Sequence, residues 1–314
     1  MKTRIWETDF ENGIPESMYK YRVMSVKHLR ELQDDFETID AEGKVSNNPV
    51  FRSYIQEKKH HLPDSLPDAK SVIVIAVFTP LMTVDFHHEG KIHEIMVSHY
   101  YDDGITEDHL KTTILNNIIG DNQYRVENAT MHVLLKRLAV RTGLGKYGRN
   151  NICYVEGMGS FLKLFAFFTD FEFDEDNWQD AEMMDSCNNC KVCLKQCPTG
   201  SISDDSFVID VGKCIPLYNE VPGEIPDWID PGSHTALMGC LRCQLPCPAN
   251  SDIATQTQKL DPITEDETKM ILDGNSDENL YQSLSEKLRM FKPEHAYYYF
   301  PVIARNLRVL IPTE

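Results

Sequence analysis

The sequence predicts an α+β protein in which an α/β domain precedes a cysteine-rich domain. One observation is the run SVIVIAVF at residues 71–78, an uninterrupted β-branched stretch typical of a strand buried on both faces. A second is the helical spacing of apolar residues at 106–120 and 129–142, with Gly143 as a stop signal. The third is a group of eight cysteines between residues 187 and 247.

Composition along the chain indicates three segments. Residues 1–65 carry amphipathic stretches such as SVKHLRELQDDF, which predict helices, and residues 81–104 form an irregular stretch rich in His and Tyr. NICYV and SFLKLFAFFTDFEF flank the turn EGMG, which is a hairpin signal. The chain becomes acidic at 174–185, which predicts a boundary there. We expect domains at 1–180, 181–255 and 256–314, the last consisting of helices that pack on the core.

Charge and composition restrict the function classes. With 49 acidic and 31 basic residues the formal charge is −18, so the long-range field repels nucleic-acid phosphates, although a local basic patch is compatible with it. The N-terminal MKTRIWETDFENG lacks an apolar run, and nowhere do about 18 uninterrupted apolar residues occur. These features predict a cytoplasmic protein without membrane contact. In a reducing compartment, clustered cysteines indicate metal ligands rather than disulfides.

The cysteine spacing indicates two 4Fe-4S clusters. CNNCKVCLKQCP has the C-x2-C-x2-C-x3-C-P spacing of bacterial ferredoxins, in which the fourth cysteine ligates the other cluster. Two four-cysteine zinc sites are the alternative, but zinc has no use for the C-x2-C-x2-C run or for the two Cys-Pro endings. Cys153, inside NICYV, is predicted to be a buried small hydrophobe. We assign one cluster to Cys187, Cys190, Cys193 and Cys247, and the second to Cys197, Cys214, Cys240 and Cys243.

The order of several segments resembles the epoxyqueuosine reductases. These segments are RLAVRTGLGKYGRNN (137–151), GMGSF (157–161), the first cysteine run, CIPLYNE (214–220) and GCLRCQLPCPAN (239–250). Those enzymes are cobalamin-dependent, carry two 4Fe-4S clusters and are related to the reductive dehalogenases. The resemblance implies a nitroreductase-like α/β cobalamin domain that is fed by a ferredoxin-like double-cluster domain. It also implies a set of cofactor-binding residues: Arg141, Gly145, Lys146, Tyr147, Gly148, Arg149, Asn150 and Ser160.

The catalytic position of that family is altered in this chain. The family's catalytic aspartate aligns, without gaps, with Ala129. Glu127 and His132 are the neighbouring candidates for a proton donor. Tyr100, which falls where the related enzymes place part of their substrate cavity, is a third candidate by this resemblance. The alternatives are a surface role for Glu127 and His132 and core packing for Tyr100.

Two weaker patterns do not define sites. GLGKYG follows a predicted helix and precedes a predicted strand, which is the reverse of a dinucleotide-binding fingerprint. Asp85-Phe-His87-His-Glu-Gly90 has the D-x-H-x-x-G spacing of methyltransferase-type cobalamin proteins, but three fixed positions often match by chance. A loop or an adventitious metal site is the favoured interpretation of this second pattern.

Together these features predict a cobalamin-dependent iron-sulfur reductase that passes electrons through two 4Fe-4S clusters to cobalt. The replaced aspartate, the acidic charge and the lack of the family's tRNA-gripping helical repeats favour a small-molecule substrate over tRNA epoxyqueuosine. A low-potential donor such as ferredoxin or flavodoxin is the expected partner. One alternative is an epoxyqueuosine reductase with a displaced acid, and the other is an electron-transfer or corrinoid-reactivating iron-sulfur protein.

Overall fold

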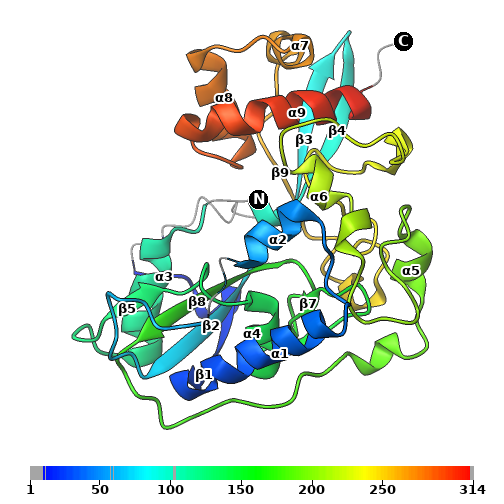
Figure 1. Ribbon diagram of the computed structural model, residues 1–314. Helices are drawn as coiled ribbons and strands as arrows, with labels where there is room; N and C mark the ends of the chain where they lie inside the picture. Colours follow the sequence, from blue (N-terminus) through cyan, green and yellow to red (C-terminus); the bar gives the residue numbers. More distant parts are fainter. Residues whose placement is uncertain (1–9, 11, 57, 59, 102–103, 312–314) are drawn as a thin grey trace. The chain divides into compact units, whose positions relative to one another are not determined.

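The computed structural model describes residues 10, 12–56, 58, 60–101 and 104–311. Contacts between Cα atoms divide the chain into two compact units, whose elements are labelled in Figure 1. The predicted boundaries at 180 and 255 do not coincide with these units, because Thr79–Gly104 belongs to the second unit. The first unit comprises Met1–Phe78, Ile105–Lys191 and Ile202–Asp210, and the second comprises Thr79–Gly104, Val192–Ser201 and Val211–Glu314.

A four-stranded antiparallel sheet forms the centre of the first unit. Its order is β1-β2-β8-β5, so β2 and β8 are the inner strands. β2 is the predicted buried strand, and its first seven residues are all buried. The sequence analysis did not predict β1, whose burial pattern mixes exposed and buried positions. The strands are β1 (Tyr19–Ser25), β2 (Ser71–Phe78), β5 (Val126–Asn128) and β8 (Leu162–Thr169).

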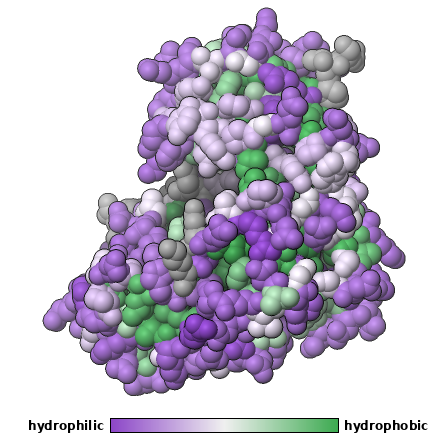
Figure 2. All heavy atoms as spheres, in the orientation of Figure 1, coloured by the Kyte–Doolittle hydropathy of each residue, from purple (hydrophilic) through white to green (hydrophobic). Residues whose placement is uncertain are grey.

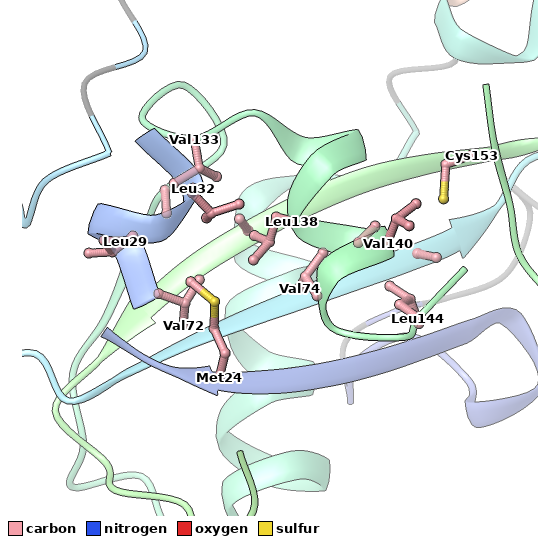
Figure 3. Close-up of a cluster of buried hydrophobic side chains, with 14 of the residues drawn as sticks. Met24, Leu29, Leu32, Val72, Val74, Val133, Leu138, Val140, Leu144 and Cys153 are labelled. Carbon is pink, nitrogen blue, oxygen red and sulfur yellow. The ribbon is translucent and has the colours of Figure 1, made fainter. Parts of the chain in front are cut away.

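Helices pack on both faces of this sheet. Helices α1 (Leu29–Ala41) and α4 (Leu135–Arg141) contribute apolar residues to the core on one face (Figure 3). Helix α3 (Glu107–Thr113) and the helical turn Ile114–Ile119 contribute to the core on the other face. The strand β2 therefore has a core on each side, which explains its uninterrupted apolar run. Val72, Val74 and Ala76 face the first core, and Ile73, Ile75 and Val77 face the second.

A smaller sheet, ordered β4-β3-β9, belongs to the second unit. The irregular structure predicted for 81–104 is wrong over much of its length, because β3 (Leu81–His88) and β4 (Lys91–Val97) form an antiparallel hairpin. Polar residues occupy the partly exposed positions of β3, and Glu89 and Gly90 turn the chain at positive φ. Strand β9 (Thr257–Lys259) pairs with β3 in parallel.

The helix predicted at 129–142 begins later than expected. Helix α4 starts at Leu135, and the residues before it form turns. The N–H of Ala129 donates to the carbonyl oxygen of Ala166 at 2.8 Å, which extends the β5–β8 pairing by one residue. Ala129 therefore belongs to the edge of the sheet and cannot open the helix.

The EGMG turn does not join two paired strands. β7 (Cys153–Tyr154) pairs with β6 (Lys146–Tyr147), whereas β8 pairs with β2 and β5. In the described chain, one isolated bridge between Val155 and Gly159 links the two sides of the turn. The predicted hairpin does not form because β7 pairs with β6, whereas β2 pairs with the whole length of β8 and β5 pairs with its last three residues.

The remaining helices lie mainly in the C-terminal part of the chain. The helices predicted at 256–314 correspond to α7, α8 and α9 in the described chain. No helix in the described ranges is both long and apolar enough to cross a membrane. Hydrophilic residues cover most of the face seen in Figure 2. These helices are α2 (Pro49–Gln56), α5 (Val192–Gln196), α6 (Pro216–Asn219), α7 (Glu265–Asp273), α8 (Glu278–Leu288) and α9 (Ala296–Leu310).

Candidate functional site

All nine cysteines are free thiols, and eight of them lie in the predicted cluster segments. Within the part of the chain that the structure describes, no three His, Cys, Asp or Glu side chains converge as ligands of a single metal ion. A 4Fe-4S cluster does not need such convergence, because each thiolate binds a different iron atom. A zinc site gathers four ligands on one ion.

Three of the four cysteines predicted for the second cluster are close enough to interact electrostatically within the second unit. Burial, followed by the neighbouring thiols of Cys240 and Cys197, raises the pKa of the Cys214 thiol to about 12. Burial also raises the pKa of Cys240, again with a contribution from Cys197. Buried thiolates that repel one another are stabilised when they bind metal, which releases their protons. These residues fit a cluster, and the inclusion of Cys243 stays a prediction.

The cysteines predicted for the first cluster are carried by short turns. Cys187 ends the 3-10 turn Asp185–Cys187, and the N–H of Cys190 donates to its carbonyl oxygen at 3.3 Å. Cys193 lies in α5 in the second unit. The N–H of Cys247 donates to the carbonyl oxygen of Gln244 at 3.2 Å. Because two of these cysteines belong to each unit, their assignment to one cluster stays a prediction.

Arg149, a predicted cofactor-binding residue, contacts the loop that carries the first two cysteines. Its Nη2 donates to the carbonyl oxygen of Cys187 at 3.0 Å, and its Nε donates to that of Cys190 at 3.2 Å. Its Nη1 forms an ion pair with Asp204 at 2.9 Å. One rigid guanidinium thus fixes two carbonyl groups of the cysteine loop. These contacts give Arg149 a positioning role that the sequence analysis did not predict.

Asn219 and Asn306 join the two segments that carry Cys214 and Cys240. The Asn219 side chain donates to the carbonyl oxygen of Gly239 at 2.7 Å and accepts from its N–H at 3.2 Å. Asn306 Nδ2 donates to the carbonyl oxygens of Asn219 and Leu237, both at 2.7 Å. Both asparagines are buried. The sequence offered no signal for them, because their partners are distant in the chain.

Replacing Asn219 by alanine is expected to lower the free energy of unfolding by about 2–4 kcal/mol. The substitution leaves the buried N–H and carbonyl group of Gly239 without their partner. Denaturant unfolding of the cluster-loaded protein measures the change. Asn275→Ala, at an exposed position, is the control and is expected to have little effect. Equal effects of the two substitutions would contradict the role given to Asn219.

Glu220 is a buried carboxyl group near Cys214. Burial raises the pKa of Glu220 to about 7, and Tyr101 opposes this shift. Burial and the charge of Glu220 raise the pKa of Tyr101, whose hydroxyl is buried. Tyr100, the predicted proton donor, is 55% exposed, and its ring stands edge-on to that of Tyr101 at 5.9 Å between centroids. A catalytic role for Tyr100 stays a prediction.

Glu127 and His132, the two other predicted proton donors, both neighbour Phe168 of strand β8. Glu127 lies on β5 and pairs with Phe168 of β8. The ring of His132 lies 6.0 Å from the Phe168 ring and 5.9 Å from that of His61, measured between centroids. Burial, followed by His61 and a nearby lysine, lowers the pKa of His132. The two candidates thus share one neighbour, and their catalytic roles stay predictions.

The glycine-rich loop is closely packed against its own neighbours. A Cβ atom at Gly145 would lie 2.6 Å from the carbonyl oxygen of Tyr154, and one at Gly148 would lie 2.5 Å from a ring carbon of Tyr154. Asn150 Nδ2 donates to the Tyr154 hydroxyl at 3.0 Å. Packing therefore explains these two glycines without a ligand. Of the other predicted corrin contacts, Lys146 pairs with Glu182, Tyr147 packs on Phe207 and Ser160 is buried.

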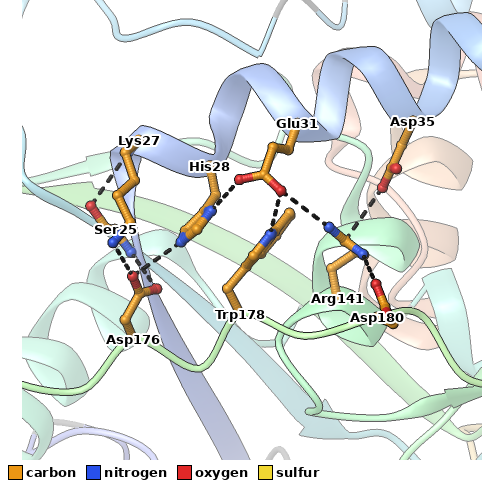
Figure 4. A network of polar contacts seen from close by, with 9 residues as sticks. All are labelled: Ser25, Lys27, His28, Glu31, Asp35, Arg141, Asp176, Trp178 and Asp180. Carbon is orange, nitrogen blue, oxygen red and sulfur yellow. Dashed lines mark hydrogen bonds and ion pairs between the residues drawn. The ribbon is translucent and has the colours of Figure 1, made fainter.

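Arg141 lies in a network that joins α1, α4 and the acidic segment (Figure 4). Its guanidinium stacks on the Trp178 ring with 4.3 Å between its central carbon and the ring centroid. It also forms ion pairs with Asp180 at 3.0 Å and with Glu31 and Asp35, each at 3.4 Å. These contacts account for the burial of its charge. Within the first unit, these contacts pack the acidic segment onto α1 and α4.

The D-x-H-x-x-G pattern lies on the β3–β4 hairpin. Asp85 forms an ion pair with Lys259 at 2.7 Å, and Gly90 adopts a φ of 69° in the turn. The pairing register places His87 opposite Ile92. The pattern therefore lies on strand β3 and the turn after it, and the loop favoured from the sequence is wrong at these positions.

Comparison with known protein families first identifies the class of the cysteine-rich domain. Residues 186–250 match the 4Fe-4S double cluster binding domain. The chain therefore contains an iron-sulfur domain of the two-cluster type, and the 4Fe-4S interpretation is confirmed.

The resemblance to the epoxyqueuosine reductases is confirmed as well. The chain is 32% identical over 146 residues to the epoxyqueuosine reductase of Francisella cf. novicida, covering 46% of this chain and 40% of the relative. It is 34% identical over 119 residues to that of Escherichia coli, covering 38% and 30%. The chain thus matches less than half of the length of these relatives.

Solved structures give the same fold. The epoxyqueuosine reductase of Streptococcus thermophilus superposes with a TM-score of 0.63 at 18% identity, covering 94% of this chain and 77% of that one. An epoxyqueuosine reductase solved with an epoxyqueuosine-modified tRNA stem loop gives a TM-score of 0.61 at 19% identity, covering 93% and 76%. The predicted combination of a mixed α/β fold and a C-terminal cluster domain is confirmed.

Proposed function

We propose that the chain is an iron-sulfur reductase of the epoxyqueuosine reductase type. The observation that carries the proposal is the group of neighbouring thiols of Cys197, Cys214 and Cys240 inside a double 4Fe-4S domain. Cysteine thiolates would hold two clusters, and Arg149 would fix the loop of the first one. Cobalamin would supply the reducing centre at the substrate. A ferredoxin or flavodoxin would supply the electrons.

The proposed substrate is epoxyqueuosine in tRNA. The similar proteins carry this name, and one of them is solved with a modified tRNA stem loop. The comparisons therefore favour the alternative of an epoxyqueuosine reductase with a displaced acid. They do not support the small-molecule substrate that was preferred from the sequence. The formal charge of −18 opposes long-range attraction of RNA but does not exclude local contacts with basic side chains.

The proposed proton donor is His132, three positions after the residue that replaces the family's aspartate. Its imidazole is half-buried beside Phe168 and His61. Because burial and nearby basic groups lower its pKa, its protonated form is a stronger acid than ordinary histidine. Glu127 is the alternative donor, since it pairs with the same Phe168.

The decisive experiment is turnover under anaerobic conditions. Protein loaded with clusters and cobalamin is mixed with a low-potential reductant and with tRNA that contains epoxyqueuosine, and the nucleosides are then quantified by mass spectrometry. We expect epoxyqueuosine to be consumed. Unchanged epoxyqueuosine, with both clusters and cobalamin present, would reject the proposed substrate.

Replacing His132 by glutamine is expected to lower kcat by about 10²–10⁴-fold, because the substitution removes a general acid. Glu127→Gln is the matched comparison. It is expected to change kcat less than tenfold, which corresponds to less than about 1.4 kcal/mol in the activation free energy. Steady-state kinetics on the same tRNA measures both. The reverse order of effects would identify Glu127 as the donor.

A further inference from the structure

Three of the four cysteines predicted for the second cluster have a hydroxyl side chain beside their sulfur atom, and all three pairs lie in the second unit. In the first pair, Thr199 Oγ1 lies 3.6 Å from Cys197 Sγ, and either atom can be the donor. A cysteine that binds iron is a thiolate and has no proton to donate. In the cluster-loaded protein the hydroxyl of Thr199 is therefore the donor of this hydrogen bond.

The second pair consists of Ser201 and Cys214. Burial and the thiols of Cys240 and Cys197 raise the pKa of Cys214 to about 12, and a hydrogen bond from the Ser201 hydroxyl opposes this shift. Ser201 is only 2% exposed. A hydrogen bond that is shielded from water is electrostatically stronger than one at the surface. The Ser201 hydroxyl is therefore well placed to act on the sulfur of Cys214.

The third pair consists of Thr235 and Cys240. The hydroxyl oxygen of Thr235 is buried and makes no hydrogen bond of ordinary geometry within the described residues. Burial raises the pKa of Cys240, whereas the backbone N–H of Arg242 and the hydroxyl of Thr235 lower it. A buried hydroxyl without an acceptor is costly, and a cluster thiolate at Cys240 would supply one. The surroundings of these cysteines thus fit a bound cluster.

We propose that the hydroxyl groups of Thr199, Ser201 and Thr235 donate hydrogen bonds to the cysteine sulfurs of the second cluster and raise its reduction potential. Reduction moves one electron from the low-potential donor, which is oxidised, to the cluster, and no proton is transferred. The added electron increases the negative charge on the sulfur ligands, so each hydrogen bond is stronger in the reduced state. Interactions that are stronger in the reduced state raise the potential.

These three hydroxyls are positioning residues for electron transfer, because they act on the cluster through its ligands. A higher potential lets a donor of given potential hold a larger fraction of the cluster reduced. For a one-electron couple, a tenfold change in the ratio of reduced to oxidised cluster corresponds to about 59 mV. The inference rests on the cluster assignment within the proposed function, and it does not depend on the substrate or on cobalamin.

The reduction potentials of the cluster-loaded protein test the proposal. An anaerobic titration with dithionite, followed by electron paramagnetic resonance, gives a midpoint for each cluster. We expect Ser201→Ala and Thr235→Val each to lower the ratio of reduced to oxidised cluster about tenfold, a shift of about −59 mV. Both substitutions should shift the same midpoint and leave the other unchanged. Unchanged midpoints, or shifts of two different midpoints, would overturn the proposal.

Further variants separate the hydrogen bond from packing. Thr235→Ser keeps a hydroxyl and is expected to keep the natural midpoint, whereas Thr235→Val keeps the shape and loses the donor. If only packing mattered, the serine variant would shift the midpoint and the valine variant would not. Thr255→Val is the matched control, because this exposed hydroxyl donates to the carbonyl oxygen of Asp252 at 3.0 Å. An equal shift in Thr255→Val would also contradict the proposal.

Iron content distinguishes a shifted potential from a lost cluster. Each variant is expected to keep about eight iron atoms per chain. Where a buried variant loads less iron, Thr199→Val at a partly exposed position should give the same shift, and an unchanged midpoint there would reject the proposal. Cys214→Ala should abolish the midpoint that the hydroxyl variants shift, and loss of the other midpoint would reject it too. Shifted midpoints without turnover of tRNA would reject only the proposed substrate.

Discussion

Replacing Cys214 by alanine is expected to remove one of the two clusters, so the iron content should fall from about eight to about four atoms per chain. Cys214 lies beside Cys197 and Cys240 in a buried position, where burial raises the pKa of its thiol to about 12. Metal binding would therefore displace the proton of this thiol. Iron and acid-labile sulfide, measured per chain after anaerobic reconstitution, report the result.

Cys153→Ala is the control for this experiment. Cys153 is more fully buried than Cys214, and burial likewise raises its pKa to about 12, but it belongs to the hydrophobic core that also contains residues of β2 and α4 (Figure 3). We expect this variant to keep about eight iron atoms and to lose only stability, since a small cavity replaces the sulfur. Full iron content in Cys214→Ala, or loss of iron in Cys153→Ala, would contradict the assignment.

The fold could be predicted from sequence where one local signal dominates. The run at 71–78 carries two apolar faces in one strand, and it indeed lies between two cores. The β3–β4 hairpin was missed because its polar positions disguise an alternating pattern. The start of α4 was missed because Ala129 bonds to Ala166 across the sheet, a tertiary contact that overrides helical spacing. Long-range pairing decided both errors.

The candidate site, like the fold, could be predicted only where the sequence carries a local signal. Cysteine spacing is a local signal, and the double-cluster domain that it predicted is confirmed at 186–250. The resemblance assigned Arg141 and Arg149 to a cofactor, yet their described contacts are with carboxylates, an indole ring and cysteine carbonyls. Asn219 and Asn306 carried no signal because their function depends on partners distant in sequence. Residues that position others in this way can be recognised only from the three-dimensional structure.

Replacing Glu220 by glutamine is expected to stabilise the protein at alkaline pH by about 3 kcal/mol, the free energy of a shift of about 2.5 pKa units. Burial raises the pKa of Glu220 to about 7, so the folded state favours the neutral carboxyl group. The corresponding stability is fully present below the unfolded pKa of about 4.3 and is lost as the pH rises through about 7. Glutamine stays neutral and keeps its stability over this window.

The measurement is the difference in denaturation midpoint between the variant and the natural protein, followed anaerobically from pH 5 to pH 8.5. Because the other titratable groups are the same in both proteins, their contributions cancel in this difference. The midpoint of the glutamine variant should rise relative to that of the natural protein as the pH increases. Glu224→Gln, in the exposed part of the same loop, should show no such growth. A constant difference across the range would mean that Glu220 is ionised in the folded protein throughout. In that case the hydroxyl of Tyr101, the group that opposes the shift, would stabilise the carboxylate fully.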